Sequence, residues 1–410
     1  MTGAHHSLLL QNAGIPGGGR RDVRIEDGVV ADVADAGTLP VTGEVLELTG
    51  FLLLPAPAEP HAHYDTALTA ATVPNPGGTL GGAVDAWRAV SPSVEPADFE
   101  QRATEVALRA LANGATAIRS HVGIYPEVGL RAVEALLRVR ERLRPWIDVQ
   151  LAALTVELTT PQGKQMEPLL REALRLGVDV VGGCPHLDPD PATCMDIYLD
   201  LAAEGNRQAD LHTDEQLDPA LDNLPLLAAK VRERGLEGRV TASHCVSLGM
   251  QSASHARDVA SALAAARVAV VSNPQTNLFL QAREVESAKP RGLTAVRPLL
   301  DAGVVVAGGG DNVQDPFNPM GRADPLETAS LLVTAGHLEP AEAYAAVSSG
   351  ARTAMGLPEV GTRAGSPAEF LAVRGGSIGE VLADPSDRLV IHRGRLVSRT
   401  TVSRQVPLPA

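Results

Sequence analysis

Two histidines separated by one residue, His61 and His63, follow an apolar run in the stretch FLLLPAPAEPHAHYD, residues 51–65. Because side chains alternate between the two faces of a β-strand, residues i and i+2 point the same way. Both imidazoles can therefore reach one point, as two ligands of a metal ion must. A His-x-His pair alone is a weak signal, and a hydrogen-bonded or surface pair is the common alternative.

Other polar residues strengthen the metal interpretation. His121, His186, His212, His244 and Asp311 each follow a short apolar run and stand where a strand should end. Six of the eleven histidines are then expected at strand ends on one rim of the fold. Structural roles explain a single histidine at such a position well, but they explain six of them poorly.

The spacing of the apolar runs predicts the architecture that would gather these residues. From the second run onward they recur about every 30 residues, the length of one strand–helix unit, and amphipathic segments lie between them. The expected strands are 51–57, 115–118, 147–153, 178–182, 209–211, 240–242, 268–271 and 304–307. The expected helices are 96–113, 128–144, 166–176, 192–204, 223–234, 254–266 and 295–302. Eight such units predict a (β/α)8 TIM barrel, whose active site lies at the carboxyl ends of its strands.

Both ends of the chain have a different pattern. Residues 7–50 and 369–397 contain short alternating strands with turns, including the hairpin signal EDG at 26–28. We expect these ends to form one small β-sandwich domain from residues 1–54 and 356–410, with the barrel occupying 55–355.

Composition limits the classes of partner. The 410 residues suffice for a barrel and a small companion domain, and the net charge of −14 argues against nucleic acid or an anionic membrane surface. No run approaches the roughly 18–20 apolar residues of a membrane span. The first residues lack a signal-peptide layout, and three cysteines do not make a disulfide framework. We therefore expect a cytoplasmic protein with a small-molecule partner, and a homo-oligomer is left open.

Four motifs together resemble one known family. They are PHAHYD at 60–65, LHTDE at 211–215, TASH at 241–244 and GDNVQDPFNPMG at 310–321. The set resembles the amidohydrolase superfamily and, within it, the cytosine deaminase group. The resemblance extends from end to end of the chain, and the last motif is the most specific part of it.

The resemblance implies a single divalent ion, Zn²⁺ or Fe²⁺, with four ligands: His61, His63, His212 and Asp311. Imidazole and carboxylate suit these metals better than Mg²⁺ or Ca²⁺. Two-metal amidohydrolases use a bridging carboxylated lysine after strand 3 or 4, whereas Lys164 lies beyond strand 3 in a Pro/Gly/Gln stretch. A bound divalent ion lowers the pKa of its water from about 15.7 toward 7, which would give metal-bound hydroxide near neutral pH.

The same resemblance assigns catalytic roles. Asp311 would take the water proton, Glu215 would protonate a ring nitrogen of the substrate, and His244 would orient the hydroxide and stabilise developing charge. The alternative for Glu215 is a helix-start carboxylate beside Asp214.

The expected reaction is hydrolytic deamination of a small nitrogen heterocycle or cyclic amidine of pyrimidine, triazine or creatinine type. The alternatives are hydrolysis of a cyclic amide or of an N-alkyl C–N bond with the same centre, and a non-catalytic barrel. A non-catalytic barrel would be expected to lack a ligand or the acid, but all are present. A Cys/His nucleophile pair using Cys184 or Cys245 is disfavoured because the metal set already supplies the nucleophile.

The residues expected to contact the substrate depart from those of cytosine deaminases. Val156 stands near the position where cytosine deaminases have a glutamine that reads the pyrimidine edge. Asn312 stands where they usually have a second aspartate after the strand-8 aspartate, and Gly123, two residues past His121, stands where relatives have an aspartate. Gln281 and Phe317 are further candidates for substrate binding. Trp87 is another candidate, and packing roles are the alternative for Gln281 and Trp87.

Cytosine should be a poor substrate, because a valine cannot make the amide hydrogen bonds that select this ring. Initial rates on cytosine, compared with those on other pyrimidines, triazines, purines and amidines, test this expectation. Cytosine turnover as efficient as that on the best compound would contradict it.

Overall fold

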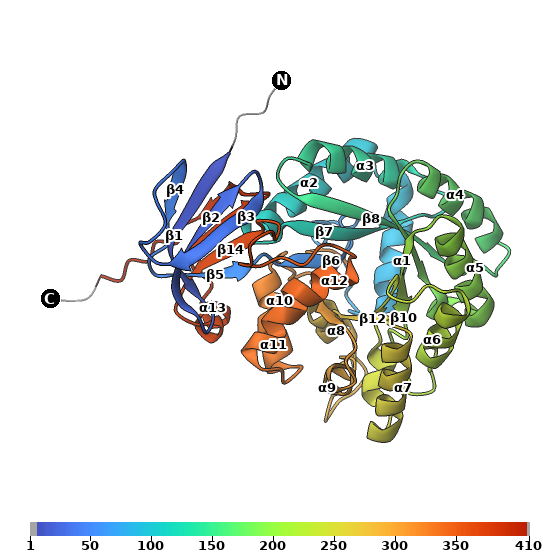
Figure 1. Cartoon of the computed structure of the whole chain (residues 1–410). Helices are drawn as coiled ribbons and strands as arrows, with labels where there is room; N and C mark the ends of the chain where they lie inside the picture. The colour runs from blue at the N-terminus through green and yellow to red at the C-terminus, as the bar shows by residue number, and fades with distance from the viewer. Residues whose placement is uncertain (1–5, 408–410) are drawn as a thin grey trace.

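One of the two sheets of the computed structural model, which describes residues 6–407, is a parallel barrel (Figure 1). Its strand order is β13-β12-β11-β10-β9-β8-β7-β6. The strands are β6 (Ala58–Ala62), β7 (Ala117–Gly123), β8 (Asp148–Val156), β9 (Val180–Cys184), β10 (Gln208–Thr213), β11 (Val240–His244), β12 (Ala269–Ser272) and β13 (Val306–Gly308). A parallel bridge between Ala62 and Asp311, with the Asp311 N–H donating to the His61 carbonyl at 2.9 Å, joins the last strand end to the first.

The helices around this barrel are α1 (Leu80–Val90), α2 (Pro96–Ala112), α3 (Arg131–Leu143), α4 (Gly163–Arg175), α5 (Pro191–Glu204), α6 (Leu224–Glu233), α7 (Ala253–Ala265), α8 (Pro274–Leu280), α9 (Val296–Asp301), α10 (Pro325–Thr334), α11 (Pro340–Ala345) and α12 (Ala351–Ala354). Most of them cover its outside, whereas α1 and α8 lie at the carboxyl ends of the strands. In α3 the buried residues recur at helical spacing, so one apolar stripe faces the strands. Gly114 follows α2 with a φ of +115°, and a Cβ there would lie 2.7 Å from Leu371, so the turn needs glycine. Among the described residues, no helix is long and apolar enough to cross a bilayer.

The second sheet is built from both ends of the chain, in the order β16-β15-β14-β5-β1-β2-β3, with β4 pairing with β1. Its strands are β1 (Ser7–Ile15), β2 (Gly19–Glu26), β3 (Val29–Asp35), β4 (Glu44–Glu47), β5 (Phe51–Pro55), β14 (Phe370–Arg374), β15 (Arg388–His392) and β16 (Arg395–Thr400), and helix α13 (Ile378–Ala383) lies within the C-terminal part. Asp27 and Gly28 form the expected turn between β2 and β3, both with positive φ. The sheet has a core of its own, separate from the barrel core.

The structure confirms the predicted fold class but corrects its first barrel strand. The run 51–57 is not a barrel strand: Phe51–Pro55 is β5 of the second sheet and pairs antiparallel with β14. The barrel begins with β6, which contains His61 itself. Pro55 and Pro57 interrupt the run, because proline cannot donate to a strand ladder. The sequence prediction did not include six of the helices: α1, α8, α10, α11, α12 and α13. The domain limits at 54/55 and 355/356 remain a prediction.

A largely buried ion pair joins the second sheet to the barrel. Arg388 of β15 donates to both carboxylate oxygens of Asp324, at 2.9 and 2.7 Å, and to the carbonyl of Asn113 at 2.6 Å. Arg388 is 5% exposed and the Asp324 side chain 13%. Asp324 also caps α10 by accepting from the Leu326 N–H. The guanidinium therefore ties β15 to two barrel elements.

Replacing Arg388 with leucine should destabilise the protein, because it leaves the largely buried Asp324 carboxylate without its cationic partner. Removing one member of a buried pair typically costs about 3–5 kcal/mol. We expect a clear fall in the thermal unfolding midpoint, measured by differential scanning calorimetry. Arg404→Leu is the matched control, since Arg404 makes a two-point ion pair with Asp384 on the surface, where both side chains are more than half exposed. Equal shifts in the two variants would contradict the prediction.

Candidate active site

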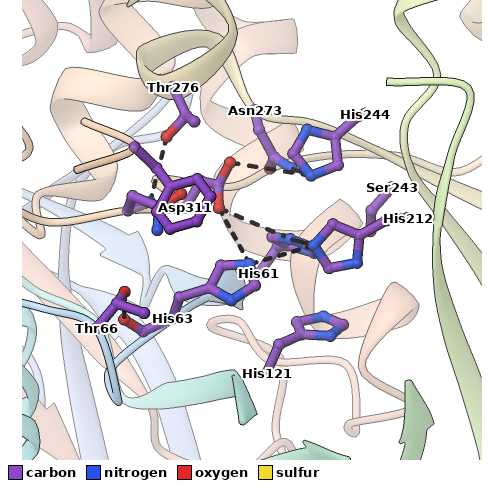
Figure 2. A network of polar contacts seen from close by, with 12 residues as sticks. His61, His63, Thr66, His121, His212, Ser243, His244, Asn273, Thr276 and Asp311 are labelled. Atoms are coloured by element: carbon purple, nitrogen blue, oxygen red, sulfur yellow. Dashed lines mark hydrogen bonds and ion pairs between the residues drawn. The ribbon is translucent and has the colours of Figure 1, made fainter. Parts of the chain in front are cut away.

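Four side chains meet at the carboxyl ends of the barrel strands (Figure 2). His61 lies in β6, His63 follows it, His212 lies in β10, and Asp311 follows β13. The Nε2 atoms of His61 and His63 each lie 3.2 Å from Nε2 of His212. Asp311 Oδ1 lies 3.4 Å from Nε2 of His63 and 3.8 Å from Nε2 of His61. The structure thus brings together all four residues predicted as metal ligands.

The donor set fits a divalent transition metal. Tetrahedral zinc with Zn–N bonds of about 2.0–2.1 Å places its nitrogen ligands about 3.3 Å apart, close to the observed separations. Burial holds the pKa of His61, His63 and His212 well below the usual range, so these rings are neutral, as metal ligands must be. Neither oxygen of the buried Asp311 carboxylate has a hydrogen-bond partner among the described residues. A cation between these groups would satisfy them.

Left-handed backbone conformations occur at Asp311 and at two other polar residues on the same rim. His244, Asp311 and Asp214 follow or end barrel strands with φ of 71°, 63° and 50°, a left-handed conformation that side-chain-bearing residues rarely adopt. Hydrogen bonds hold these turns in place, including Asp311 N–H to His61 and Ser247 N–H to the Asp214 carbonyl at 3.1 Å. Such strain is retained where surrounding structure over-determines it, commonly at functional sites.

A buried carboxylate supports the histidines from below. Asp210 of β10 accepts from Arg119 at 2.9 Å and from the Ser243 hydroxyl at 2.8 Å. Its Oδ1 lies 3.9 Å from His61 Nδ1 and 3.7 Å from His121 Nε2. His61, His121 and Asp210 are close enough to form a second ligand group, but Arg119 already neutralises the carboxylate. The arrangement favours one metal ion, with Asp210 as electrostatic support.

His244 lies between the two carboxylates expected to handle protons. Its Nε2 is 3.9 Å from Asp311 Oδ2, and its Nδ1 is 3.3 Å from Glu215 Oε1. Burial lowers the pKa of His244 to about 3, so the ring is neutral and one nitrogen donates while the other accepts. Desolvation raises the pKa of Glu215 to about 8, so its carboxyl keeps a proton at neutral pH. A protonated carboxyl in a cavity is suited to act as a general acid.

A cavity of about 690 Å³, counted with its open mouth, lies over this cluster. Val156, Asn312 and Phe317, three of the four residues predicted to bind substrate, line it, and so does Trp87. Gln281 does not line it but borders a groove outside, and its amide donates to the backbone carbonyl of Glu215 at 3.0 Å. Asn312 is engaged within the protein, where its amide donates to Asp315 at 2.7 Å.

The cavity wall away from the metal ligands is largely apolar. Its apolar and aromatic members are Leu80, Val84, Trp87, Tyr125, Leu154, Val156, Leu187 and Phe317. Tyr125 takes the space beside Gly123, where a Cβ would lie 2.7 Å from the tyrosine ring. The wall therefore favours stacking and apolar contact over hydrogen bonds to a ring edge.

Three features that support or line the site were not predicted from the sequence: Asp210, Tyr125 and helix α1. Asp210 lies two residues before His212, so period-2 alternation places both on one face of β10, and that signal was available. Tyr125 and helix α1 were not singled out because they follow no strand-end pattern.

His121 and His186, the other two histidines predicted at strand ends, lie beside the four-residue cluster and contact its members. His121 packs its ring 4.2 Å from that of His61, centroid to centroid, and His186 Nδ1 donates to the His212 carbonyl at 2.9 Å. Burial raises the pKa of both the Cys184 and Cys245 thiols, which argues against a thiolate nucleophile.

Comparisons with known proteins agree with this geometry. The model of the amidohydrolase family matches residues 82–398. A pterin deaminase of Rhizobium rhizogenes (strain K84 / ATCC BAA-868) is 30% identical over 93% of this chain and 88% of its own length. A 5-methylcytosine deaminase from Klebsiella pneumoniae, liganded with phosphonocytosine, superposes with a TM-score of 0.90 at 27% identity, covering 98% of this chain and 100% of that chain. The N-isopropylammelide isopropylaminohydrolase from Burkholderia multivorans ATCC 17616 gives a TM-score of 0.84 at 27% identity, covering 96% and 99%.

The chain therefore belongs to the amidohydrolase family. It is a metal-dependent hydrolase of the cytosine deaminase-like group that acts on C–N bonds other than peptide bonds.

The purified enzyme should contain about one equivalent of a divalent transition metal. The cluster of three histidines and Asp311 offers four ligands for one ion, whereas the nearby Asp210 carboxylate is already paired with Arg119. His212→Ala should lose most of this metal, as measured by inductively coupled plasma mass spectrometry. His255→Ala, which removes a histidine from the surface helix α7, is the control and should keep it. Two equivalents in fully active enzyme would contradict the single-metal assignment.

Proposed function

We propose that this enzyme hydrolytically deaminates an amino-substituted pyrimidine ring that is fused to a second ring or bears a ring substituent, as in pterin or 5-methylcytosine. Water adds to the ring carbon bearing the amino group, ammonia leaves, and a ring carbonyl remains. The observation that carries this proposal is the Glu215–His244–Asp311 line at the base of an apolar cavity.

We assign His61, His63, His212 and Asp311 to hold one divalent ion, Zn²⁺ or Fe²⁺. When bound, the ion supplies the Lewis acidity that makes water nucleophilic near neutral pH. Asp311 directs Oδ1 toward the histidine cluster and Oδ2 toward His244. One carboxylate can thus serve as a ligand through Oδ1 and accept the proton of the attacking water at Oδ2.

Glu215 provides the proton that the substrate needs. Addition of hydroxide to a ring carbon places negative charge on the adjacent nitrogen, and that charge is costly in an apolar cavity unless a proton arrives with it. The Glu215 carboxyl is buried, lines the cavity and retains its proton at neutral pH. His244 contacts both carboxyl groups, so it orients the nucleophile and stabilises the developing charge.

The apolar wall supports the choice of substrate class. Val156 and Leu154 end β8 beside the cavity, where neither side chain can hydrogen-bond to the edge of an unsubstituted pyrimidine. Trp87, Tyr125 and Phe317 add aromatic surface, which suits a second ring or an apolar substituent. The names of the pterin and 5-methylcytosine deaminases point to the same kind of substrate.

Cleavage of an N-alkyl group is the second candidate, favoured by the structural likeness to N-isopropylammelide isopropylaminohydrolase. A panel of pterin, 5-methylcytosine, cytosine and N-isopropylammelide, assayed with Zn²⁺- and Fe²⁺-loaded enzyme, separates the candidates. Ammonia from pterin or 5-methylcytosine supports the proposal. Release of isopropylamine from N-isopropylammelide, with no ammonia from the other three compounds, would favour N-alkyl cleavage and contradict the proposal.

Replacing Glu215 with glutamine should lower kcat by about 10²–10⁴ and leave the metal content unchanged, because the variant keeps the shape but cannot donate the proton. kcat/KM should fall in parallel, since the proton moves in the transition state. Glu284→Gln, at an exposed site on the outer groove, is the matched control. Loss of metal from Glu215→Gln would make this residue a ligand, and near-normal kcat would place the acid elsewhere.

A further inference from the structure

Helix α8 carries three side-chain amides at intervals of four residues: Asn273 at its N-cap, Asn277 within it, and Gln281 at its C-cap. This spacing puts them on one side of the helix. Asn273 Nδ2 lies 3.3 Å from His244 Nε2, and Asn277 Nδ2 lies 3.2 Å from His244 Nδ1. Figure 2 shows Asn273 facing His244. Gln281 Nε2 donates to the Glu215 carbonyl at 3.0 Å.

The backbone that bears these side chains is hydrogen-bonded along the helix. The backbone N–H of Asn277 donates to the backbone carbonyl of Asn273 at 3.1 Å, and the backbone N–H of Gln281 donates to that of Asn277 at 3.0 Å. Gly292 packs its backbone against Gln281, and a Cβ there would lie 2.6 Å from the Gln281 Cβ. The side chains therefore act from a fixed base.

The same helix also holds the segment that bears Asp311. The Thr276 hydroxyl accepts from the Asn312 N–H at 3.2 Å, directly after Asp311. One short helix thus contacts His244, the backbone of Glu215 and the backbone beside Asp311. These are the three groups to which the proposed function assigns proton handling.

The two asparagine amides contact both ring nitrogens of His244. The side-chain oxygens of Asn273 and Asn277 have no partner among the described residues, so each amide can donate to its ring nitrogen or, turned over, accept from it. The pair can therefore hold the neutral ring in place with its hydrogen on either nitrogen.

We propose that Gln281 is a positioning residue for the reaction: through its hydrogen bond to the Glu215 backbone it aims the Glu215 carboxyl at the substrate. The inference rests on the proposed function, because it acts through Glu215. It replaces the expectation that Gln281 touches the substrate, and it extends to Asn277, which holds His244 from the same helix. A shift of about 1 Å in a catalytic group can cost on the order of 10²-fold in rate.

The test is a double-mutant cycle between Gln281 and Glu215, with pterin and 5-methylcytosine as substrates. Gln281→Ala should lower kcat about tenfold, with KM changed less than about threefold, because the residue does not contact the substrate. In the Glu215→Gln background the same substitution should have no further effect on kcat. A generally structural role would lower kcat equally in both backgrounds.

Two further variants make the test specific. Gln275→Ala removes another glutamine of α8, whose amide donates to Thr328 at 2.7 Å, and it should leave kcat near the wild-type value. Gln281→Glu keeps the length of the side chain but cannot donate, so it should reproduce the kcat loss if the alanine variant folds poorly.

Each other outcome overturns the inference. Additive losses in the cycle would make Gln281 structural, a raised KM with unchanged kcat would make it a substrate contact, and unchanged kinetics would remove any role. If Glu215→Gln alone keeps wild-type kcat, the acid assignment of the proposed function fails, and the role of Gln281 fails with it. If Glu215→Gln loses activity and only the cycle is additive, the proposed function stands and the inference alone is wrong.

Discussion

The active site is organised around four largely buried side chains whose lone pairs face one another at short distance. The facing Nε2 atoms of His61, His63 and His212 and the Asp311 carboxylate occupy a volume from which water is largely excluded. Neutral imidazole nitrogens 3.2 Å apart repel unless a proton or a cation lies between them. Burial disfavours the protonated rings, so a metal ion is the favourable solution. The closed barrel provides this convergence because parallel strand ends meet at one rim.

In the proposed function, the groups around the cluster complete the reaction within the same desolvated surroundings. Desolvation that keeps the histidines neutral also keeps a proton on Glu215. Asp210 would repel the Asp311 carboxylate, but Arg119 neutralises it from beneath the site. Helix α8 then fixes the orientation of His244 and of the Glu215 loop. In the proposed function, metal binding, nucleophile activation and proton donation are therefore shared among neighbouring residues of one desolvated cavity, and Asp311 takes part in the first two.

Much of this arrangement could be predicted from the sequence, since strand ends of a repeating β/α pattern share a rim. The convergence of His61, His63, His212 and Asp311 follows from that rule. The first barrel strand was misplaced because the apolar run 51–57 resembles a buried strand, and only the pairing of β5 with β14 shows that it belongs to the other sheet. Gln281 was expected in the pocket, but its position depends on where helix α8 packs against the Glu215 loop, which periodicity does not encode. The short helices α1 and α8 were missed because their packing against the rim, more than an apolar stripe, determines their place.

The fate of the ring atoms during turnover in H₂¹⁸O tests the central claim most directly. Mass spectrometry and ammonia determination on the products of pterin and 5-methylcytosine give both the site of oxygen incorporation and the leaving group. The account predicts one ¹⁸O in place of the amino group, an intact ring and one ammonia per turnover. An opened ring that retains its amino nitrogen, or a product that keeps the amino group and gains no ¹⁸O, would contradict it.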